Sequence, residues 1–413
     1  MPLGFGSYRV SIKSEEHREA LEHALDCGCD FIDTSANYTD GDSEKLIGDV
    51  IKKREHKPFV MTKAGYIQGQ NIDVITQLNN VGIAKEGLVK VNDDLWHSIH
   101  PDFLRNQIEL SLKRLGTESV DAFLLHNPEY YFYEDGVNQD EYYERIENAF
   151  KEMEALAQEG KIKSYGISSN NFILPIDHPK VTNLERVIEL AEKIDAKHFE
   201  WIQFPFNLIE IGALEKHYNG LSLVDLARSR GLKTAINRPL NAFVNGNLVR
   251  LADYDPFLIF MDKAQGEELY QKCMKLLNEK VKESDPDEDV KEIPLIKQFE
   301  ELYHDLPSED AVQQVFMGHF FPLVARIYGG DLSPEDSIPY YELYDYSVNR
   351  SRQVMSAKAN DFAKQAIESG LLLEGPGSLQ EKIIQKYEDY GFDRILVGMK
   401  RKIYVDQLKT FLD

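Results

Sequence analysis

The chain has 413 residues, 42% of them hydrophobic and 28% charged, and its 70 acidic residues outnumber the 47 basic ones to give a net charge of −23 at pH 7. This length is enough for a large apolar core and excludes a small scaffold held together by disulfides. A field of that sign repels phosphate backbones and anionic lipid heads, so we expect the protein to bind neither nucleic acid nor membrane surfaces.

Short apolar runs alternate with helix-period segments along most of the chain, which is typical of βα units around a parallel sheet. Several runs are apolar on both alternations, as in strands that are covered on both faces. The pattern predicts eight strands: Gly4–Tyr8, Phe31–Ser35, Phe59–Gly65, Ala122–Asn127, Ile162–Ser168, Trp201–Phe206, Lys233–Asn237 and Arg394–Met399.

Helices are predicted between these strands, and each ends shortly before the next strand begins. Thr182 and Glu185 have the spacing of a capping box at the start of one of them. The predicted helices are Glu15–Asp26, Ser43–Lys53, Asp102–Leu115, Glu141–Gln158, Thr182–Ile194 and Ser222–Arg230. The repeat predicts an α/β fold, a (β/α)₈ TIM barrel.

Two stretches interrupt the repeat. Tyr66–Ile99 is long for a connection after the third strand, and such loops are usually functional. Asn241–Gly377 contains the helix-period segments Lys263–Lys280 and Pro294–His304, together with the charged run Lys282–Glu292, which we expect to be solvated and mobile. We therefore predict one domain, residues 1–413, interrupted by a large, mainly helical insertion after strand 7, at about 241–377.

The three cysteines, Cys27, Cys29 and Cys273, form no disulfide framework. The start of the chain lacks a basic segment followed by an apolar run, and no apolar stretch approaches the ~20 residues of a membrane helix. We expect reduced thiols and a cytoplasmic protein.

Four polar side chains fall at successive strand ends. Asp33 and Tyr38 follow the second strand, Lys63 ends the third and His126 ends the fourth. The carboxyl ends of barrel strands meet on one face, so we expect these side chains to lie together.

Their chemistry is complementary. A tyrosine has an ordinary pKa of about 10, and a neighbouring lysine ammonium lowers it. Asp33 can hold Lys63, while His126 can donate a hydrogen bond to a substrate carbonyl. The set predicts reduction of a C=O group with a proton from Tyr38, and the hydride implies a nicotinamide cofactor.

The motifs resemble those of the aldo-keto reductase superfamily across residues 1–240 and about 378–413. Asp33–Tyr38 resembles its Asp-Thr-Ala-x-x-Tyr element. Lys63 and His126 occupy the places of its third-strand lysine and fourth-strand histidine. The other similar stretches are Gly4–Arg9, Gly160–Asn170, Gln203 with Asn207–Glu210, and Val397–Lys400.

This resemblance implies an NAD(P)H-dependent enzyme, a carbonyl reductase or alcohol dehydrogenase that converts an aldehyde or ketone, such as a sugar or another small carbonyl compound, to an alcohol. Tyr38 is the implied general acid, supported by Lys63, Asp33 and His126. The implied cofactor residues are Ser7, Tyr8, Ser168, Ser169, Gln203, Asn237, Lys400, Arg401, Lys402 and Gln407. The basic cluster Lys400–Lys402 favours the 2′-phosphate of NADPH over NADH.

One departure concerns the seventh strand. The family's Tyr-Ser-Pro-Leu element carries an aromatic ring that stacks on the nicotinamide, whereas this chain reads Ile236-Asn237-Arg238-Pro239-Leu240. Asn237 cannot stack in that way. The fifth-strand element also reads Ser168-Ser169-Asn170 in place of Ser-Asn, which leaves open which group meets the cofactor.

Two other functions remain open. A metal-dependent barrel hydrolase could use His97, His100 and His126, but it would give Tyr38 and Lys63 no task, so we expect no metal. A nicotinamide-binding regulatory or interaction module with little turnover would keep the fold and the cofactor site.

Overall fold

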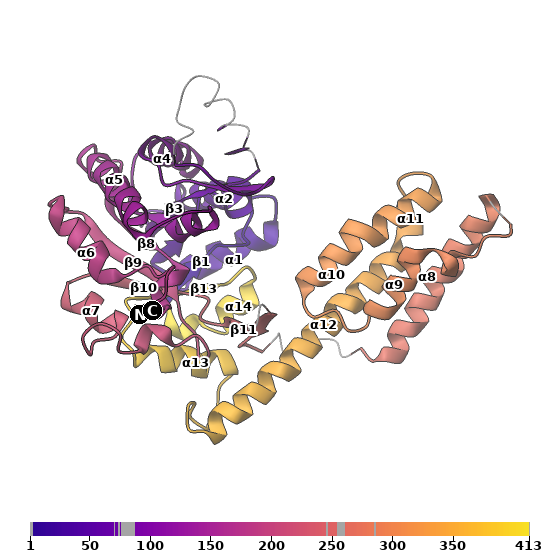
Figure 1. The fold of residues 1–413 in the computed structure, drawn as a ribbon. Helices are drawn as coiled ribbons and strands as arrows, with labels where there is room; N and C mark the ends of the chain where they lie inside the picture. Colours follow the sequence, from indigo (N-terminus) through magenta and orange to yellow (C-terminus); the bar gives the residue numbers. More distant parts are fainter. Residues whose placement is uncertain are drawn as a thin grey trace. The chain divides into compact units, whose positions relative to one another are not determined.

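A computed structural model describes residues 3–69, 71, 72, 75, 87–244, 247–253, 261–284 and 286–412. The chain divides into two compact units (Figure 1). The first, here the barrel unit, comprises Met1–Gly246 and Gln380–Asp413, and the second, the helical unit, comprises Asn247–Leu379.

Eight parallel strands close the barrel unit in the order β1-β13-β10-β9-β8-β7-β3-β2. They are β1 (Leu3–Gly6), β2 (Phe31–Asp33), β3 (Phe59–Ala64), β7 (Val120–His126), β8 (Ile162–Ser168), β9 (Phe199–Pro205), β10 (Lys233–Asn237) and β13 (Arg394–Gly398). Each matches a predicted strand, and the predicted (β/α)₈ barrel is confirmed.

Helices surround these strands in the barrel unit. They are α1 (Glu15–Asp26), α2 (Asp42–Ile51), α4 (Pro101–Leu115), α5 (Gln139–Gln158), α6 (Leu184–Lys193), α7 (Leu223–Ser229), α13 (Leu379–Glu388) and α14 (Lys402–Asp406). Short 3₁₀ turns are η1 (Tyr38–Gly41), η2 (Pro128–Tyr133), η3 (Asn170–Ile173), η4 (Gly212–Leu214) and η7 (Lys409–Phe411).

The predicted capping box of Thr182 with Glu185 is wrong. The N-cap of α6 is Asn183, whose Oδ1 accepts from the backbone N–H groups of Glu185 at 2.8 Å and Arg186 at 3.4 Å. The Thr182 hydroxyl is buried and bonds Ser169 Oγ at 2.8 Å instead. Asn caps a helix as well as Thr does, so tertiary burial decides between the two neighbours.

Near the amino ends of its strands the barrel is filled by three aromatic rings, here called the aromatic plug: Phe31, Phe59 and Trp201. Phe31 stacks on Phe59 with ring centroids 4.8 Å apart, and Trp201 lies 5.7 Å from Phe31. Gly166 of β8 faces Trp201 so closely that a Cβ there would lie 1.9 Å from the Trp201 carbonyl oxygen. Only glycine lets β8 and β9 pair beside this plug.

The stretch after β3 contains a small antiparallel sheet in the order β4-β6-β5, formed by β4 (Tyr66–Ile67), β5 (Val89–Asn92) and β6 (Leu95–His97). Residues 70, 73, 74 and 76–86 of the predicted functional loop Tyr66–Ile99 lie outside the described residues. Tyr66 follows β3 closely, and the sheet pairs it in register with His97.

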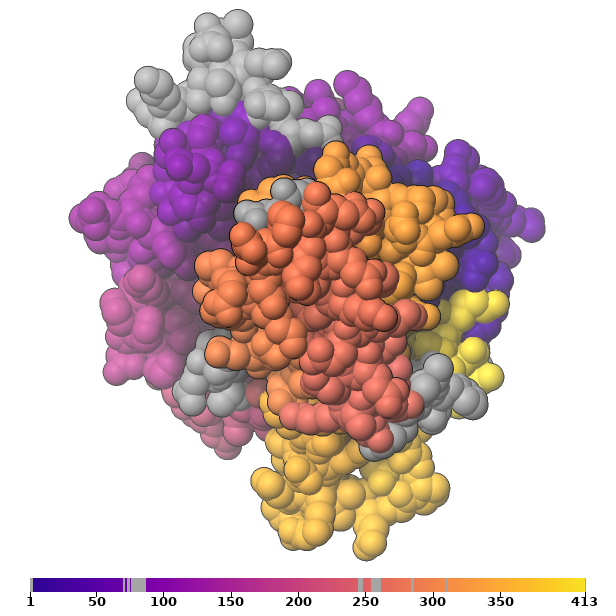
Figure 2. Space-filling view, turned by 90° about the vertical axis from the view of Figure 1, so that its right-hand side faces the viewer, coloured from indigo at the N-terminus to yellow at the C-terminus, as the bar shows by residue number. Residues whose placement is uncertain are grey.

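The helical unit follows β11 (Asn241–Val244). It contains β12 (Asn247–Arg250), α8 (Lys263–Ser284), η5 (Val290–Glu292), α9 (Pro294–Leu302), α10 (Glu309–Val315), the π-helix η6 (Phe316–Phe320), α11 (Phe321–Tyr328) and α12 (Pro334–Glu368). In Figure 2 the orange residues of this unit form one closely packed body.

The helical unit has its own aromatic core. Phe299 stacks on Phe320 with centroids 4.2 Å apart, and Tyr270 stacks on Tyr303 at 4.8 Å. The charged run Lys282–Glu292 is exposed at most of its described positions, as predicted, but it is not uniformly irregular. Its first residues extend α8, Val290 is buried, and Asp289 caps η5 by accepting from Lys291 N–H at 2.9 Å.

Candidate active site at the carboxyl end of the barrel

A buried ion pair lies at the carboxyl ends of β2 and β3. The side chain of Lys63 is 1% exposed, and its Nζ donates to Asp33 Oδ1 at 2.6 Å and to the Thr34 carbonyl oxygen at 2.7 Å. The same ammonium lies 5.2 Å from the centroid of the Tyr38 ring. The structure therefore brings Lys63 together with Asp33 and Tyr38, which belong to a different strand end.

The backbone after Tyr38 is strained. Thr39 and Asp40 have φ angles of 47° and 57°, and Gly41 has 83°. Left-handed backbone is unfavourable for a β-branched residue such as Thr39, and it persists only where its surroundings enforce it. The Thr39 hydroxyl supplies part of that enforcement by donating to the Val10 carbonyl oxygen at 2.6 Å. This turn holds the Tyr38 ring over the lysine.

The electrostatics of Tyr38 correct one expectation. Burial, the Asp33 carboxylate and Tyr8 raise the pKa of Tyr38 well above its usual value, so the expected lowering by Lys63 is wrong. The reason is that burial, the largest cause, and the negative charge of Asp33 outweigh the favourable effect of the Lys63 ammonium on the phenolate. At neutral pH the phenol keeps its proton, as a general acid must before it reacts.

His126 stands beside Tyr38 with a ring-to-ring distance of 5.9 Å. Burial, the Lys63 ammonium and His97 lower the pKa of His126 well below its usual value, so the ring is neutral. Its Nδ1 contacts Ser35 Oγ at 2.9 Å. A neutral imidazole has a single N–H, and this serine contact determines whether Nε2 offers a proton or a lone pair to a ligand.

A chain of amides connects the ion pair to β9 and β10. Gln203 Nε2 donates to Asp33 Oδ1 at 2.8 Å, and Gln203 Oε1 accepts from Ser168 Oγ at 2.8 Å and from Asn237 Nδ2 at 3.5 Å. Three of the residues predicted to bind a cofactor, Ser168, Gln203 and Asn237, thus form one network with the predicted catalytic aspartate.

The side chains of two other predicted cofactor residues are directed into the protein. Ser7 is fully buried and donates to the Asp33 carbonyl oxygen at 2.8 Å, while accepting from Ser43 at 2.8 Å. Ser169 is also fully buried, and its hydroxyl forms a hydrogen bond with the Thr182 hydroxyl at 2.8 Å. Tyr8, in contrast, is 62% exposed and its ring meets that of Tyr38 edge to face at 5.1 Å.

The predicted phosphate-binding residues Lys400, Arg401, Lys402 and Gln407 lie around α14, which follows the last barrel strand. Arg401 Nε lies 3.2 Å from Glu16 Oε1, and Lys402 is exposed. An incoming phosphate would therefore compete with Glu16 for Arg401.

An aromatic wall, formed by Tyr66, His97, Tyr130 and Tyr133, adjoins His126. The Tyr66 ring lies 4.7 Å from that of His126 and 4.9 Å from that of Tyr130. His97 stacks on Tyr130 at 5.3 Å, and Tyr133 follows at 5.1 Å from Tyr130. Sequence reasoning missed this wall, although Tyr66 directly follows the third-strand motif that ends in Gly65.

Two charged residues of this face were also missed. Burial raises the pKa of Glu129, in η2, to about 7; its Oε1 accepts from Asn170 N–H at 2.8 Å, while Oε2 is buried without a hydrogen-bond partner among the described residues. Arg238 follows β10 with a φ of 56°, and its Nη2 pairs with Glu210 Oε1 at 2.9 Å. The signal in the sequence that could have identified Glu129 and Arg238 as site residues is their position shortly after the strands β7 and β10.

The histidines considered for a metal site have other partners. His97 lies in a strand, and its Nε2–H donates to the His126 carbonyl oxygen at 2.8 Å. His100 caps α4 by accepting from Asp102 N–H at 3.3 Å. Within the ranges that the structure describes, no group of three or more His, Cys, Asp or Glu side chains could hold a metal ion.

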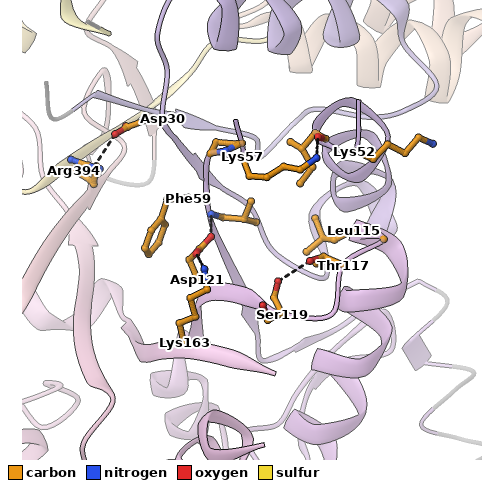
Figure 3. A pocket seen from close by; sticks show the side chains of 14 residues that line it. Asp30, Lys52, Lys57, Phe59, Leu115, Thr117, Ser119, Asp121, Lys163 and Arg394 are labelled. Atoms are coloured by element: carbon orange, nitrogen blue, oxygen red, sulfur yellow. Dashed lines mark hydrogen bonds and ion pairs between the residues drawn. The ribbon is translucent and has the colours of Figure 1, made fainter. Parts of the chain in front are cut away.

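A cavity of ≈ 550 Å³ lies at the opposite, amino end of the barrel (Figure 3). Asp30, Phe59, Asp121, Lys163 and Arg394 line it, all at or near strand beginnings. Lys163 Nζ donates to Asp121 Oδ1 at 2.7 Å, and Asp121 Oδ2 accepts from Val60 N–H at 2.8 Å. None of the predicted site residues lines this cavity, so the candidate site remains the carboxyl end.

No helix in the described part of the chain is long and apolar enough to cross a membrane. The described cysteines Cys27, Cys29 and Cys273 are all unpaired, as predicted.

Comparison with known proteins links the barrel to one family. The model of the aldo/keto reductase family matches residues 2–198. The aldo-keto reductase yakc [NADP(+)] of Schizosaccharomyces pombe is 27% identical over 261 residues, which cover 60% of this chain and 64% of that protein. The uncharacterized oxidoreductase YqkF of Bacillus subtilis is 27% identical over 201 residues, 48% of this chain and 55% of its own length.

A third relative, the NADH-specific methylglyoxal reductase of Escherichia coli, is 23% identical over 240 residues that cover 58% of this chain and 60% of the relative. The chain thus spans less than two thirds of the length of each of these relatives. Among solved structures, the glycerol dehydrogenase of Gluconobacter oxydans is similar in fold, with a TM-score of 0.50 at 17% identity over 98% of this chain and 85% of that one.

Proposed function

Because the barrel unit belongs to the aldo/keto reductase family, we propose that this protein is an enzyme that reduces an aldehyde or ketone to an alcohol with NADPH. The observation that supports this most directly is the buried Lys63–Asp33 pair, whose ammonium lies 5.2 Å from the ring of Tyr38. A protonated phenol above a fixed cation is a general acid whose conjugate base is stabilised in place.

In this proposal Tyr38 gives its proton to the carbonyl oxygen of the substrate. The phenolate that remains gains a favourable interaction with the Lys63 ammonium, which Asp33 and the Thr34 carbonyl oxygen hold in position. Neutral His126 orients the substrate oxygen, and Ser35 orients His126. A bound NADPH supplies the hydride.

The chain offers polar groups that fit such a cofactor. Asn237 Oδ1 is buried without a hydrogen-bond partner among the described residues, next to Gln203 and Ser168. The exposed ring of Tyr8 adjoins Tyr38. Lys400, Arg401 and Lys402 suit a doubly charged 2′-phosphate, with Gln407 at the adenine, and so favour NADPH, although the relatives include proteins named for NADP(+) and for NADH.

The aromatic wall favours a small carbonyl compound, sugars included, because it combines apolar ring faces with tyrosine hydroxyl groups. One similar protein is named as a methylglyoxal reductase, and methylglyoxal is a small polar carbonyl compound of this kind. Three free cysteines fit a reducing compartment, the cytoplasm.

The test is oxidation of NADPH in the presence of a panel of small aldehydes, ketones and sugars, for the wild type and Tyr38→Phe. Removing the general acid should lower kcat/KM at least about 100-fold. Tyr390→Phe, between α13 and β13, is the matched control and should keep full activity. An active Tyr38→Phe variant contradicts the assigned role, and cofactor binding without turnover on any substrate indicates an interaction module instead.

A further inference from the structure

Asn237 stands at the end of β10, at the position where the family resemblance predicts an aromatic ring on the nicotinamide. We propose that Asn237 binds the carboxamide of the nicotinamide through its Oδ1, and so positions by a hydrogen bond the ring that other barrels position by stacking. The inference rests on the proposed function and adds a residue that orients the hydride donor.

The orientation of the Asn237 amide follows from Asp33. A carboxylate accepts hydrogen bonds and cannot donate them, so Gln203 must direct its NH₂ group toward Asp33, where Nε2 lies 2.8 Å from Oδ1. Gln203 Oε1 consequently faces Ser168 and Asn237, both of which must donate to it. The NH₂ group of Asn237 is thereby turned toward Gln203, and its Oδ1 away.

This Oδ1 is buried and has no hydrogen-bond partner among the described residues. A buried acceptor without a partner destabilises the protein unless a ligand supplies the missing donor. The protein therefore presents one acceptor, of fixed direction, beside the predicted catalytic network.

The partner must be a donor. The carboxamide NH₂ is the hydrogen-bond donor that the nicotinamide ring carries, whereas an aldehyde or ketone group has none. The other groups that the resemblance assigns to the carboxamide are already engaged: Gln203 on Asp33 and Ser168, Ser168 on Gln203, and Ser169 on Thr182. Asn237 is left as the group that fits.

The test is calorimetric titration of the full-length protein with NADP⁺ and with its 3-acetylpyridine analogue, in which a methyl ketone replaces the carboxamide. The analogue keeps the carbonyl and loses the N–H. The wild type should bind NADP⁺ about 10-fold more tightly than the analogue, and Asn237→Leu should bind the two with equal affinity.

Ile236→Val, the neighbouring buried residue on the same strand, controls for packing changes and should keep the 10-fold preference. An Asn237→Leu variant that still prefers NADP⁺ 10-fold would overturn the inference and leave the proposed function standing. A wild type that binds neither dinucleotide would instead overturn the proposed function.

Discussion

Two buried glutamates at opposite ends of the barrel differ in how completely the protein surrounds their charge. At the amino end, before β9, Glu154 Oε1 accepts from the backbone N–H groups of Lys197 and His198, each at 2.9 Å, and its Oε2 contacts His198 Nδ1 at 2.9 Å. Burial opposes the charge, but these hydrogen bonds prevail and the pKa of Glu154 lies below its usual value.

At the carboxyl end, Glu129 Oε1 accepts from Asn170 N–H, and Oε2 has no hydrogen-bond partner among the described residues. Burial outweighs the hydrogen bonds that favour the charge and raises the pKa of Glu129 to about 7. Thr39, Asp40 and Arg238 on this face also have left-handed backbone. Hydrogen bonds thus preserve the charge of Glu154, whereas at the carboxyl end an unpaired carboxylate oxygen of Glu129 lies on the same face as left-handed Thr39, Asp40 and Arg238. Such features are found where a fold is shaped for a ligand rather than for stability alone.

Among substitutions that distinguish a stabilising amino end from a functional carboxyl end, Phe31→Ala should have the largest effect on stability. Phe31 is fully buried in the plug beside Phe59 and Trp201, so the change should lower the free energy of unfolding by about 3–5 kcal/mol. Urea unfolding followed by circular dichroism measures this, and kcat per folded molecule should stay close to that of the wild type. Loss of turnover with unchanged stability would break the comparison.

A smaller effect is expected from pH and Glu129. Because its pKa is raised from 4.5 to about 7, the folded protein keeps this proton after the unfolded chain has released it. The group therefore lowers stability as pH rises from about 4.5 to about 7, by about 3 kcal/mol at most, and adds no further change above. Glu129→Gln should abolish that dependence, so the free energy of unfolding of the variant, relative to the wild type, should increase across this range. A constant difference from pH 4 to 8 would show that Glu129 titrates normally.

The smallest effect is expected at α14. If Lys400–Lys402 hold the 2′-phosphate, Arg401→Ala should weaken NADPH binding about 5-fold and leave NADH binding unchanged, as measured by fluorescence titration. Arg54→Ala is the matched control, since Arg54 pairs with Asp26 and its side chain is 25% exposed, compared with 26% for Arg401. Equal weakening of both cofactors by Arg401→Ala would argue against a phosphate site.

The strands and the ion-pair constellation could be predicted because they follow from local pattern and one rule of topology. Apolar runs such as Ile162–Ser168 read as buried strands, and the convergence of strand ends places Asp33 beside Lys63. The direction of the Tyr38 pKa shift could not be predicted in this way, because it depends on burial and on the nearby Asp33 carboxylate. Ser35 and Glu129 were also missed, because their contacts and burial are known only from the structure: Ser35 contacts His126, and Glu129 is buried.

The helical unit was harder to read. Its longest helix, α12, continues through Pro339, a residue that in a sequence indicates a helix boundary. A π-helix joins α10 to α11 and departs from the regular 3.6-residue period. The segments Lys263–Lys280 and Pro294–His304 were found because their periods are intact, and they correspond to α8 and α9.

The pairing of β1 with β13 has a consequence for how the molecule is made. Leu3 lies opposite Ile395 in this ladder, so closing the barrel joins its first and last strands, which the whole helical unit separates in sequence. Seven strands of the barrel are synthesised before the helical unit. Until β13 has been synthesised, β1 and β10 each lack the strand that pairs with one of their edges. Such a distant contact is slow to form, and the open edges can meanwhile pair with other chains. Early folding of the helical unit would bring β13 closer to its place and shorten that exposure.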